Sequence, residues 1–186
     1  MLIGYTLDAL AARLRAQAWR GLGVRSAAGA KAHAGSRVRC AWGHAELGER
    51  AELYRGVQVL CTGAGRFRLG ARSHIAPGGY LLVGGSTLEI GSGVAIGPQV
   101  AIFCEANGAR AGLPFIEQHV SAPVRIGDNV FLGARVTVLP GAVIEPNVVV
   151  AAHAVVRGRL ASGFVYGGVP ARELHPLQPA ERPDPS

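Results

Sequence analysis

The sequence predicts an all-β chain folded as a parallel β-helix, and a six-residue repeat is the main evidence for it. From Ile126 to Val156 a branched aliphatic residue recurs at every sixth position. An α-helix has a period of about 3.6 residues and a half-buried strand a period of about two, so neither explains the spacing. Six extended residues span roughly 20 Å, and three such sides make one triangular coil whose aliphatic residues point inward.

The same spacing occurs earlier in the chain, in three sets of three aliphatic residues. The sets are Leu47, Leu53 and Val59, then Leu69, Ile75 and Leu81, then Ile90, Ile96 and Ile102. We therefore expect five coils, which begin at residues 47, 69, 90, 126 and 144. The extra residues between the early sets are interpreted as bulges at the corners, and neighbouring coils should pair about 4.8 Å apart.

The amino-acid composition is consistent with tight coils, and it argues against a membrane-spanning segment and a nucleic-acid partner. The 186 residues are 49% hydrophobic but only 6% aromatic, with 27 glycines, which is typical of small side chains and many turns. No apolar run is long enough to span a membrane. The formal charge is +7, but the arginines are scattered and not interleaved with aromatic residues, so nucleic acid is not a predicted partner.

The cysteines bear on the cellular compartment. Cys40, Cys61 and Cys104 are odd in number and widely spaced. They fit neither a disulfide framework nor a zinc-binding pattern, so we predict a reducing, cytoplasmic location.

The N-terminal segment, residues 1–30, is predicted to be helical over residues 6–20. Its apolar face has helical spacing and consists of Leu7, Leu10, Leu14 and Ala18. We expect this face to pack on the chain's own domain; contact with a membrane surface is the alternative.

Two further segments depart from the repeat. Residues 103–125 are too polar and irregular for the side of a coil, so we expect a loop that leaves one corner of the β-helix domain, residues 31–174. The proline-rich segment 175–186 is predicted to be a disordered tail.

Residues 123–174 resemble the C-terminal half of the hexapeptide-repeat acyltransferases, and the segments "LPGAVI" and "GGVPAR" carry the resemblance. The branch most similar is that of the maltose, galactoside and serine O-acetyltransferases and their polysaccharide-modifying relatives. The resemblance implies a left-handed β-helix, a homotrimer, and acetyl-CoA bound in the clefts between subunits. It also implies acetyl transfer to a hydroxyl or amino group of a sugar, with a surface-polysaccharide precursor as the candidate acceptor.

The resemblance also assigns a donor site. Ala134 and Ala152 fall where the family contacts the thiol arm of CoA. Arg157, Gly158 and Arg172 fall where it contacts the adenine and phosphate end, and guanidinium groups pair well with phosphate.

The catalytic position departs from the family. Where the family usually has a histidine, this chain has Asn107, and the neighbouring position is Glu105. A base that removes the acceptor's proton contributes about 10²–10⁴-fold to the rate, and an asparagine cannot be that base. His119 in the loop is one candidate replacement, and Glu105 is another if burial raises its pKa.

Three other interpretations stay open. An amino-sugar acceptor would be nucleophilic without a protein base, with Asn107 orienting the amine or the thioester carbonyl. The chain could be a catalytically silent structural or regulatory protein. It could also be a β-helix of the carbonic-anhydrase type, but no metal site is predicted, because His74, His119 and His153 lie on different coils.

Overall fold

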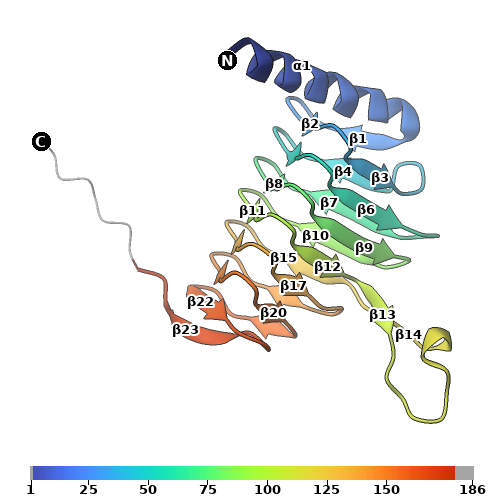
Figure 1. The fold of residues 1–186 in the computed structure, drawn as a ribbon, viewed down its shortest axis with the longest axis vertical. Coiled ribbons are helices and arrows are strands. Elements are labelled where there is room, and N and C mark those ends of the chain that lie inside the picture. Colours follow the sequence, from blue (N-terminus) through green and yellow to red (C-terminus); the bar gives the residue numbers. More distant parts are fainter. Residues whose placement is uncertain (1, 179–186) are drawn as a thin grey trace, which may run out of the picture.

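The computed structural model describes residues 2–178, with side chains from Asp8 onward, and confirms a parallel β-helix with one N-terminal helix (Figure 1). Three parallel sheets form the sides of a triangular prism, which we call faces A, B and C. Face A contains β1 (Val24–Ser26), β4 (Ala45–Leu47), β7 (Arg66–Leu69), β10 (Thr87–Ile90), β15 (Val124–Ile126), β18 (Val143–Ile144) and β21 (Arg159–Leu160).

Faces B and C complete each coil. Face B contains β2 (Lys31–Ala32), β5 (Glu52–Leu53), β8 (His74–Ile75), β11 (Ala95–Ile96), β16 (Phe131–Leu132), β19 (Val149–Val150), β22 (Phe164–Gly167) and the antiparallel β23 (Arg172–Pro176). Face C contains β3 (Arg37–Arg39), β6 (Gln58–Cys61), β9 (Tyr80–Gly84), β12 (Ala101–Phe103), β17 (Thr137–Val138) and β20 (Val155–Val156).

The aliphatic residues of the repeat form the core. On face A the register stacks one inward residue of each coil on the next, and all six are buried: Leu47, Leu69, Ile90, Ile126, Ile144 and Leu160. The four inward side chains in the middle of this stack therefore each have an apolar neighbour above and below, which a lone coil could not provide.

Within residues 2–178 the structure has six complete coils and a partial seventh, one complete coil more than the five predicted. The additional complete coil precedes Leu47. The missed coil keeps the six-residue spacing, but its inward residues are Ser26, Ala32 and Val38. The Ser26 hydroxyl donates to the Ala16 carbonyl at 3.0 Å, so the helix covers this end of the prism. The small inward residues leave space for the helix at this end of the prism. Because two of the three are not branched aliphatics, the repeat was not recognised there from the sequence.

The helix packs on the face opposite to the one predicted. In α1 (Leu2–Ala18) and the 3-10 turn η1 (Trp19–Leu22), the buried side chains are Ala12 and Ala16, whereas Leu10 is 53% and Leu14 59% exposed. The small alanine side chains allow the helix to lie close to the backbone of the first coil. The Arg15 side chain donates to the Ala32 carbonyl at 2.7 Å. The side chain of Leu7 lies outside the described side chains.

Both ends of the predicted domain shift. The first strand, Val24–Ser26, lies inside the segment assigned to residues 1–30. At the other end, Arg172–Pro176 is strand β23, so the predicted tail is ordered at its start, and residues 179–186 lie outside the described residues. No helix within residues 2–178 is long and apolar enough to cross a membrane.

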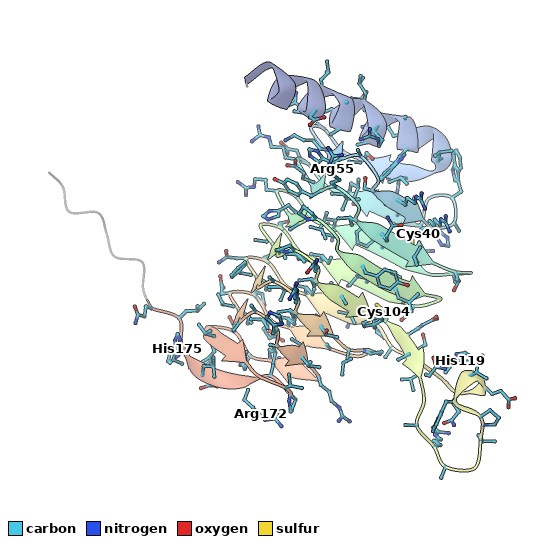
Figure 2. All side chains as sticks on the ribbon, viewed as in Figure 1. Cys40, Arg55, Cys104, His119, Arg172 and His175 are labelled. Atoms are coloured by element: carbon cyan, nitrogen blue, oxygen red, sulfur yellow. A yellow bond between two sulfur atoms is a disulfide. The ribbon has the colours of Figure 1, made fainter. Side chains whose placement is uncertain are left out.

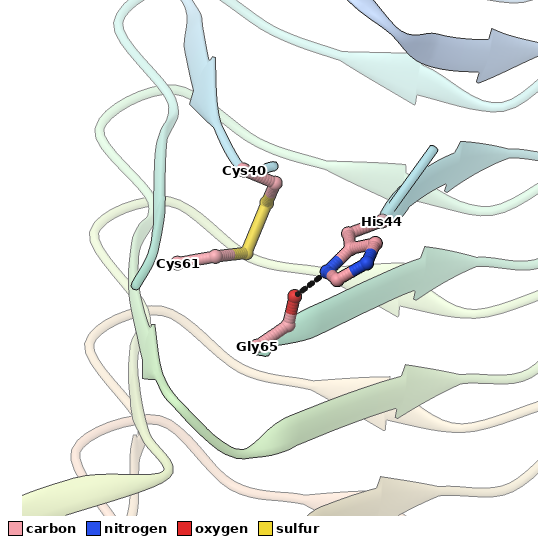
Figure 3. Close-up of a disulfide and its surroundings, with 4 residues drawn as sticks. All are labelled: Cys40, His44, Cys61 and Gly65. Atoms are coloured by element: carbon pink, nitrogen blue, oxygen red, sulfur yellow. Dashed lines mark hydrogen bonds between the residues drawn. A yellow bond between two sulfur atoms is a disulfide. The ribbon is translucent and has the colours of Figure 1, made fainter. Parts of the chain in front are cut away.

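The prediction that no disulfide forms was wrong. Cys40 and Cys61 are bonded, with Cα atoms 4.6 Å apart (Figure 3). Their separation of 21 residues is one coil of this part of the chain, so they lie at the same end of face C on successive coils. Unpaired cysteines therefore no longer argue for a reducing compartment.

Cys104 remains free and buried. Burial raises the pKa of its thiol to about 11. Because the thiolate is the reactive form, this cysteine should be inert near neutral pH.

We predict that maleimide at pH 7 labels no cysteine of the native, unreduced protein. Denaturation without reductant should expose one thiol, that of Cys104, and denaturation with reductant should expose three. Intact-protein mass spectrometry counts the labels. Three labels without reductant would show that Cys40 and Cys61 are not bonded.

Candidate active site

The segment predicted to leave the prism does so, as an ordered arm. Strands β13 (Glu105–Asn107) and β14 (His119–Ser121) pair antiparallel, joined through the 3-10 turn η2 (Phe115–Glu117). The arm, residues 105–121, starts after β12 where face C meets face A, and projects from the prism (Figure 1). It is a paired hairpin and not the irregular loop that its polar sequence suggested.

Gln118 organises the tip of the arm. Its buried side-chain amide donates to the carbonyls of Arg110 and Leu113, each at 2.9 Å, and accepts the N–H of Arg110 at 2.7 Å. Sequence reasoning missed this role, because one more polar residue in a polar segment gives no signal.

The three candidate catalytic residues lie together on the arm. Asn107 and His119 are direct cross-strand partners. The Asn107 amide donates to the Phe115 carbonyl at 2.8 Å, which fixes it as part of the turn. The exposed His119 imidazole makes no hydrogen bond or ion pair to any described residue.

Glu105 has a structural partner. Its carboxylate accepts the N–H of Gly85 at 2.6 Å, at the base of the arm. A side chain at Gly84, where φ is +59°, would collide with this carboxylate. Glu105 therefore anchors the arm on coil three, whereas the His119 imidazole is bonded to no described residue.

The predicted contacts to the thiol arm of CoA stack on one corner. Ala134 and Ala152 are two residues beyond the inward positions of β16 and β19, where face B meets face C. The corner is close-packed, since a Cβ added to Gly133 would lie 2.5 Å from the Ala152 nitrogen. The result is a strip of small residues along which a thin ligand can lie against the backbone.

The predicted contacts to the phosphate end divide between two corners. Arg172 is exposed on β23 and pairs in register with Gly167, so it lies on face B at the C-terminal end of the alanine strip. Arg157 and Gly158 follow β20 and lie where face C meets face A. Figure 2 shows His119 on the arm and Arg172 on the closing strand, well apart in one chain.

The predicted site residues thus form two groups in a single chain. The arm, Arg157 and Gly158 belong to one edge of face C, and Ala134 and Ala152 to the other. A side of six residues is roughly 20 Å wide, so a thioester beside one group is out of reach of the other. Among residues 2–178, no group of three or more His, Cys, Asp or Glu side chains could hold a metal ion.

We predict that Gln118→Ala loosens the tip of the arm, because three hydrogen bonds are lost together. Limited proteolysis should then cut within residues 108–118 at least several times faster than in the parent chain. Gln99→Ala, which removes an exposed side-chain contact to Arg135 on the prism, is the control and should leave the rate unchanged. Equal cleavage of all three proteins would show that Gln118 does not order the tip.

Comparisons with known proteins identify the repeat and the fold. Residues 123–158 match the bacterial transferase hexapeptide model, described as six repeats. A protein of Escherichia coli strain K12, named for lipopolysaccharide biosynthesis O-acetyl transfer (WbbJ), is 52% identical over 52 residues, or 28% of this chain. The match spans 26% of that relative's length.

Two solved structures extend the likeness over the prism. A maltose O-acetyltransferase from Clostridium difficile 630 is 27% identical, with a TM-score of 0.62 over 71% of this chain and 69% of that one. The N-acyltransferase AntD from Bacillus cereus, solved with dTDP-4-amino-4,6-dideoxyglucose and coenzyme A, shares the fold at 18% identity. Its TM-score is 0.79 over 88% of this chain and 89% of that one. The predicted resemblance is thus confirmed: the chain is a hexapeptide-repeat β-helix protein that carries the bacterial transferase repeat.

Proposed function

We propose that this protein transfers an acetyl group from acetyl-CoA to a hydroxyl or amino group of a sugar. The observation that carries the proposal is that residues 123–158, which match the bacterial transferases, present the alanine strip of Ala134 and Ala152. The names of the E. coli and C. difficile proteins, and the coenzyme A and amino-sugar nucleotide of the AntD structure, support donor and acceptor classes of this kind.

A homotrimer would bring the two groups of site residues together. Face A carries exposed ion pairs along its outer surface, for example Arg25 with Glu46 and Arg159 with Glu145. Outward apolar side chains gather instead on the other two faces. On face B, from coil four onward, they are Ala95, Phe131, Val149 and Val165, and on face C, from coil two onward, they are Leu60, Tyr80, Leu82, Phe103 and Val155. A ring of three copies that packs faces B and C against neighbouring copies would cover these apolar surfaces.

The arm fits the same arrangement. Phe115 is 66% and Ile116 76% exposed, so its tip carries apolar side chains into solvent in the single chain. Exposed apolar groups of this kind mark interaction sites. In the trimer, the arm of one copy would lie over the alanine strip of its neighbour, which places His119 and Ala152 on opposite walls of one cleft.

The residues of the cleft can then divide the work. Arg172 would pair with phosphate groups of CoA, and the alanine strip would hold the thiol arm extended. His119 would take the proton from the acceptor as its oxygen or nitrogen attacks the thioester carbonyl. The carbon–sulfur bond then breaks, and the proton passes from the imidazole to the departing CoA sulfur. Asn107 is already bonded within the arm and would support His119 from the neighbouring strand.

We predict that millimolar CoA raises the melting temperature of the protein. A ligand present at about a hundred times its Kd adds about 2.7 kcal/mol of stability, and each kcal/mol shifts the melting temperature by about 2–4 °C in a chain of this size. Ala152→Trp should abolish the shift by filling the strip, whereas Ala64→Trp, at an exposed alanine on another corner, should keep it. Absence of a shift in the parent protein would favour a silent structural role.

The base is tested separately, with acceptors offered to the CoA-binding protein. His119→Ala should lower turnover of a hydroxyl acceptor by about 10²-fold or more and leave the CoA-dependent shift intact. His175→Ala, which alters an exposed histidine outside the cleft, should have no effect. Unchanged turnover of an amino sugar by His119→Ala would assign the reaction to amine transfer without a protein base.

A further inference from the structure

A pocket with charged and aromatic side chains in its lining, which plays no part in the donor site, lies beneath α1. It has a volume of about 460 Å³ and is lined by Asp8, Ala9, Lys31, His33, Glu52, Tyr54, Arg55 and Pro77. Small-molecule sites commonly have about 300–1,000 Å³. The pocket therefore has the size of a ligand site. The first three coils and α1 all contribute to its lining.

Its walls hold a network of paired polar groups around Glu52. Glu52 Oε1 is 2.6 Å from His33 Nε2, and Glu52 Oε2 is 3.3 Å from Lys31 Nζ. These side chains are only 18–27% exposed. Ionised groups that are largely withdrawn from water cost free energy unless they are paired, and here the pairing also fixes the direction of each group.

An aromatic surface adjoins the network. The His33 and Tyr54 rings stack with centroids 5.1 Å apart and planes within 3°. Arg55 is exposed at the mouth, just below α1 (Figure 2), and forms no ion pair with any described residue. A guanidinium and an ammonium group bind phosphate well, and carboxylate oxygens accept hydrogen bonds from sugar hydroxyls.

The pocket lies on the same corner as the alanine strip. His33 and Tyr54 follow the inward residues of β2 and β5 directly, and Arg55 holds on coil two the place that Ala134 holds on coil five. Three coil spacings of about 4.8 Å place Arg55 about 14 Å from Ala134. An acceptor of moderate length could therefore have its sugar at the thioester and its other end in the pocket.

We infer that the pocket binds the phosphate-bearing end of the acceptor, which makes the acceptor a glycosyl phosphate or diphosphate and not a neutral sugar. Arg55 and Lys31 would contact the phosphate, and His33 with Tyr54 would support the ring beside it. This inference rests on the proposed acetyl transfer, but it can fail independently, since it concerns binding of the acceptor and not of CoA.

Calorimetric titration of the full chain tests the inference without an activity assay. The probes are glucose 1-phosphate, UDP-glucose, glucose and inorganic phosphate, at constant ionic strength. At least one of the two phosphorylated sugars should bind with a Kd at or below the millimolar range, and more tightly than glucose or inorganic phosphate. Arg55→Ala should weaken that binding about tenfold or more, the loss expected for one charge-assisted contact.

Arg66→Ala is the matched control, because it removes one exposed arginine from face A and leaves the pocket intact. It should bind the probe as the parent does, and both variants should keep the CoA-dependent rise in melting temperature. The inference is overturned if neither phosphorylated sugar binds, or if glucose and inorganic phosphate bind as tightly as the phosphorylated sugars. It is also overturned if Arg55→Ala binds the phosphorylated sugar as tightly as the parent protein does. If CoA gives no shift, it is the proposed function that fails.

Discussion

The rest of the structure depends on the stacking of one inward aliphatic residue on the next, coil after coil. From Leu47 to Val156 each such residue is almost fully buried, and the parallel strands that carry them pair with the strands directly above and below. Because the coil repeats, a residue's distance from the last inward residue decides whether it faces the core, a side or a corner. Ala134 and Ala152 share a corner for that reason, and so does Arg55 three coils away.

The prism leaves apolar surface that one chain cannot cover. Outward apolar side chains of faces B and C, the tip of the arm, and Leu10 and Leu14 of α1 are at least partly exposed in the single chain, while face A carries exposed ion pairs. Exposed ion pairs add little stability but keep a surface wet. The faces therefore differ: face A carries charged pairs, whereas faces B and C leave apolar side chains that the single chain does not cover.

Sequence reasoning succeeded where the repeat is written in branched aliphatics, from Leu47 to Val156. It failed at the first coil, because Ser26 and Ala32 keep the spacing but are not branched aliphatic residues. The disulfide was within reach, since Cys40 and Cys61 are separated by the same 21 residues as Val38 and Val59. The exposure of Leu10 and Leu14 could not be predicted. The sequence shows which face of the helix is apolar, but it does not show that the end of the prism has room only for alanine side chains.

The candidate site residues stay predictions, and the sequence did not indicate how they are arranged. The resemblance named residues on two corners, and only the assignment of strands to faces shows that they are separated by a whole side of the prism. The pairing of His33 with Glu52 was also invisible, because it joins residues one coil apart. Such contacts depend on the length of each coil, which varies with its bulges.

Cross-linking between the arm and the alanine strip tests most directly whether the site forms between subunits. The double variant His119→Cys, Ala152→Cys would be treated in solution with a short bis-maleimide, to which the native cysteines should be inert. We expect covalent dimers and trimers on a denaturing gel from the double variant, and only monomers from either single variant. A link formed only within one chain, or none in a protein of native trimer mass, would contradict a site built from two copies.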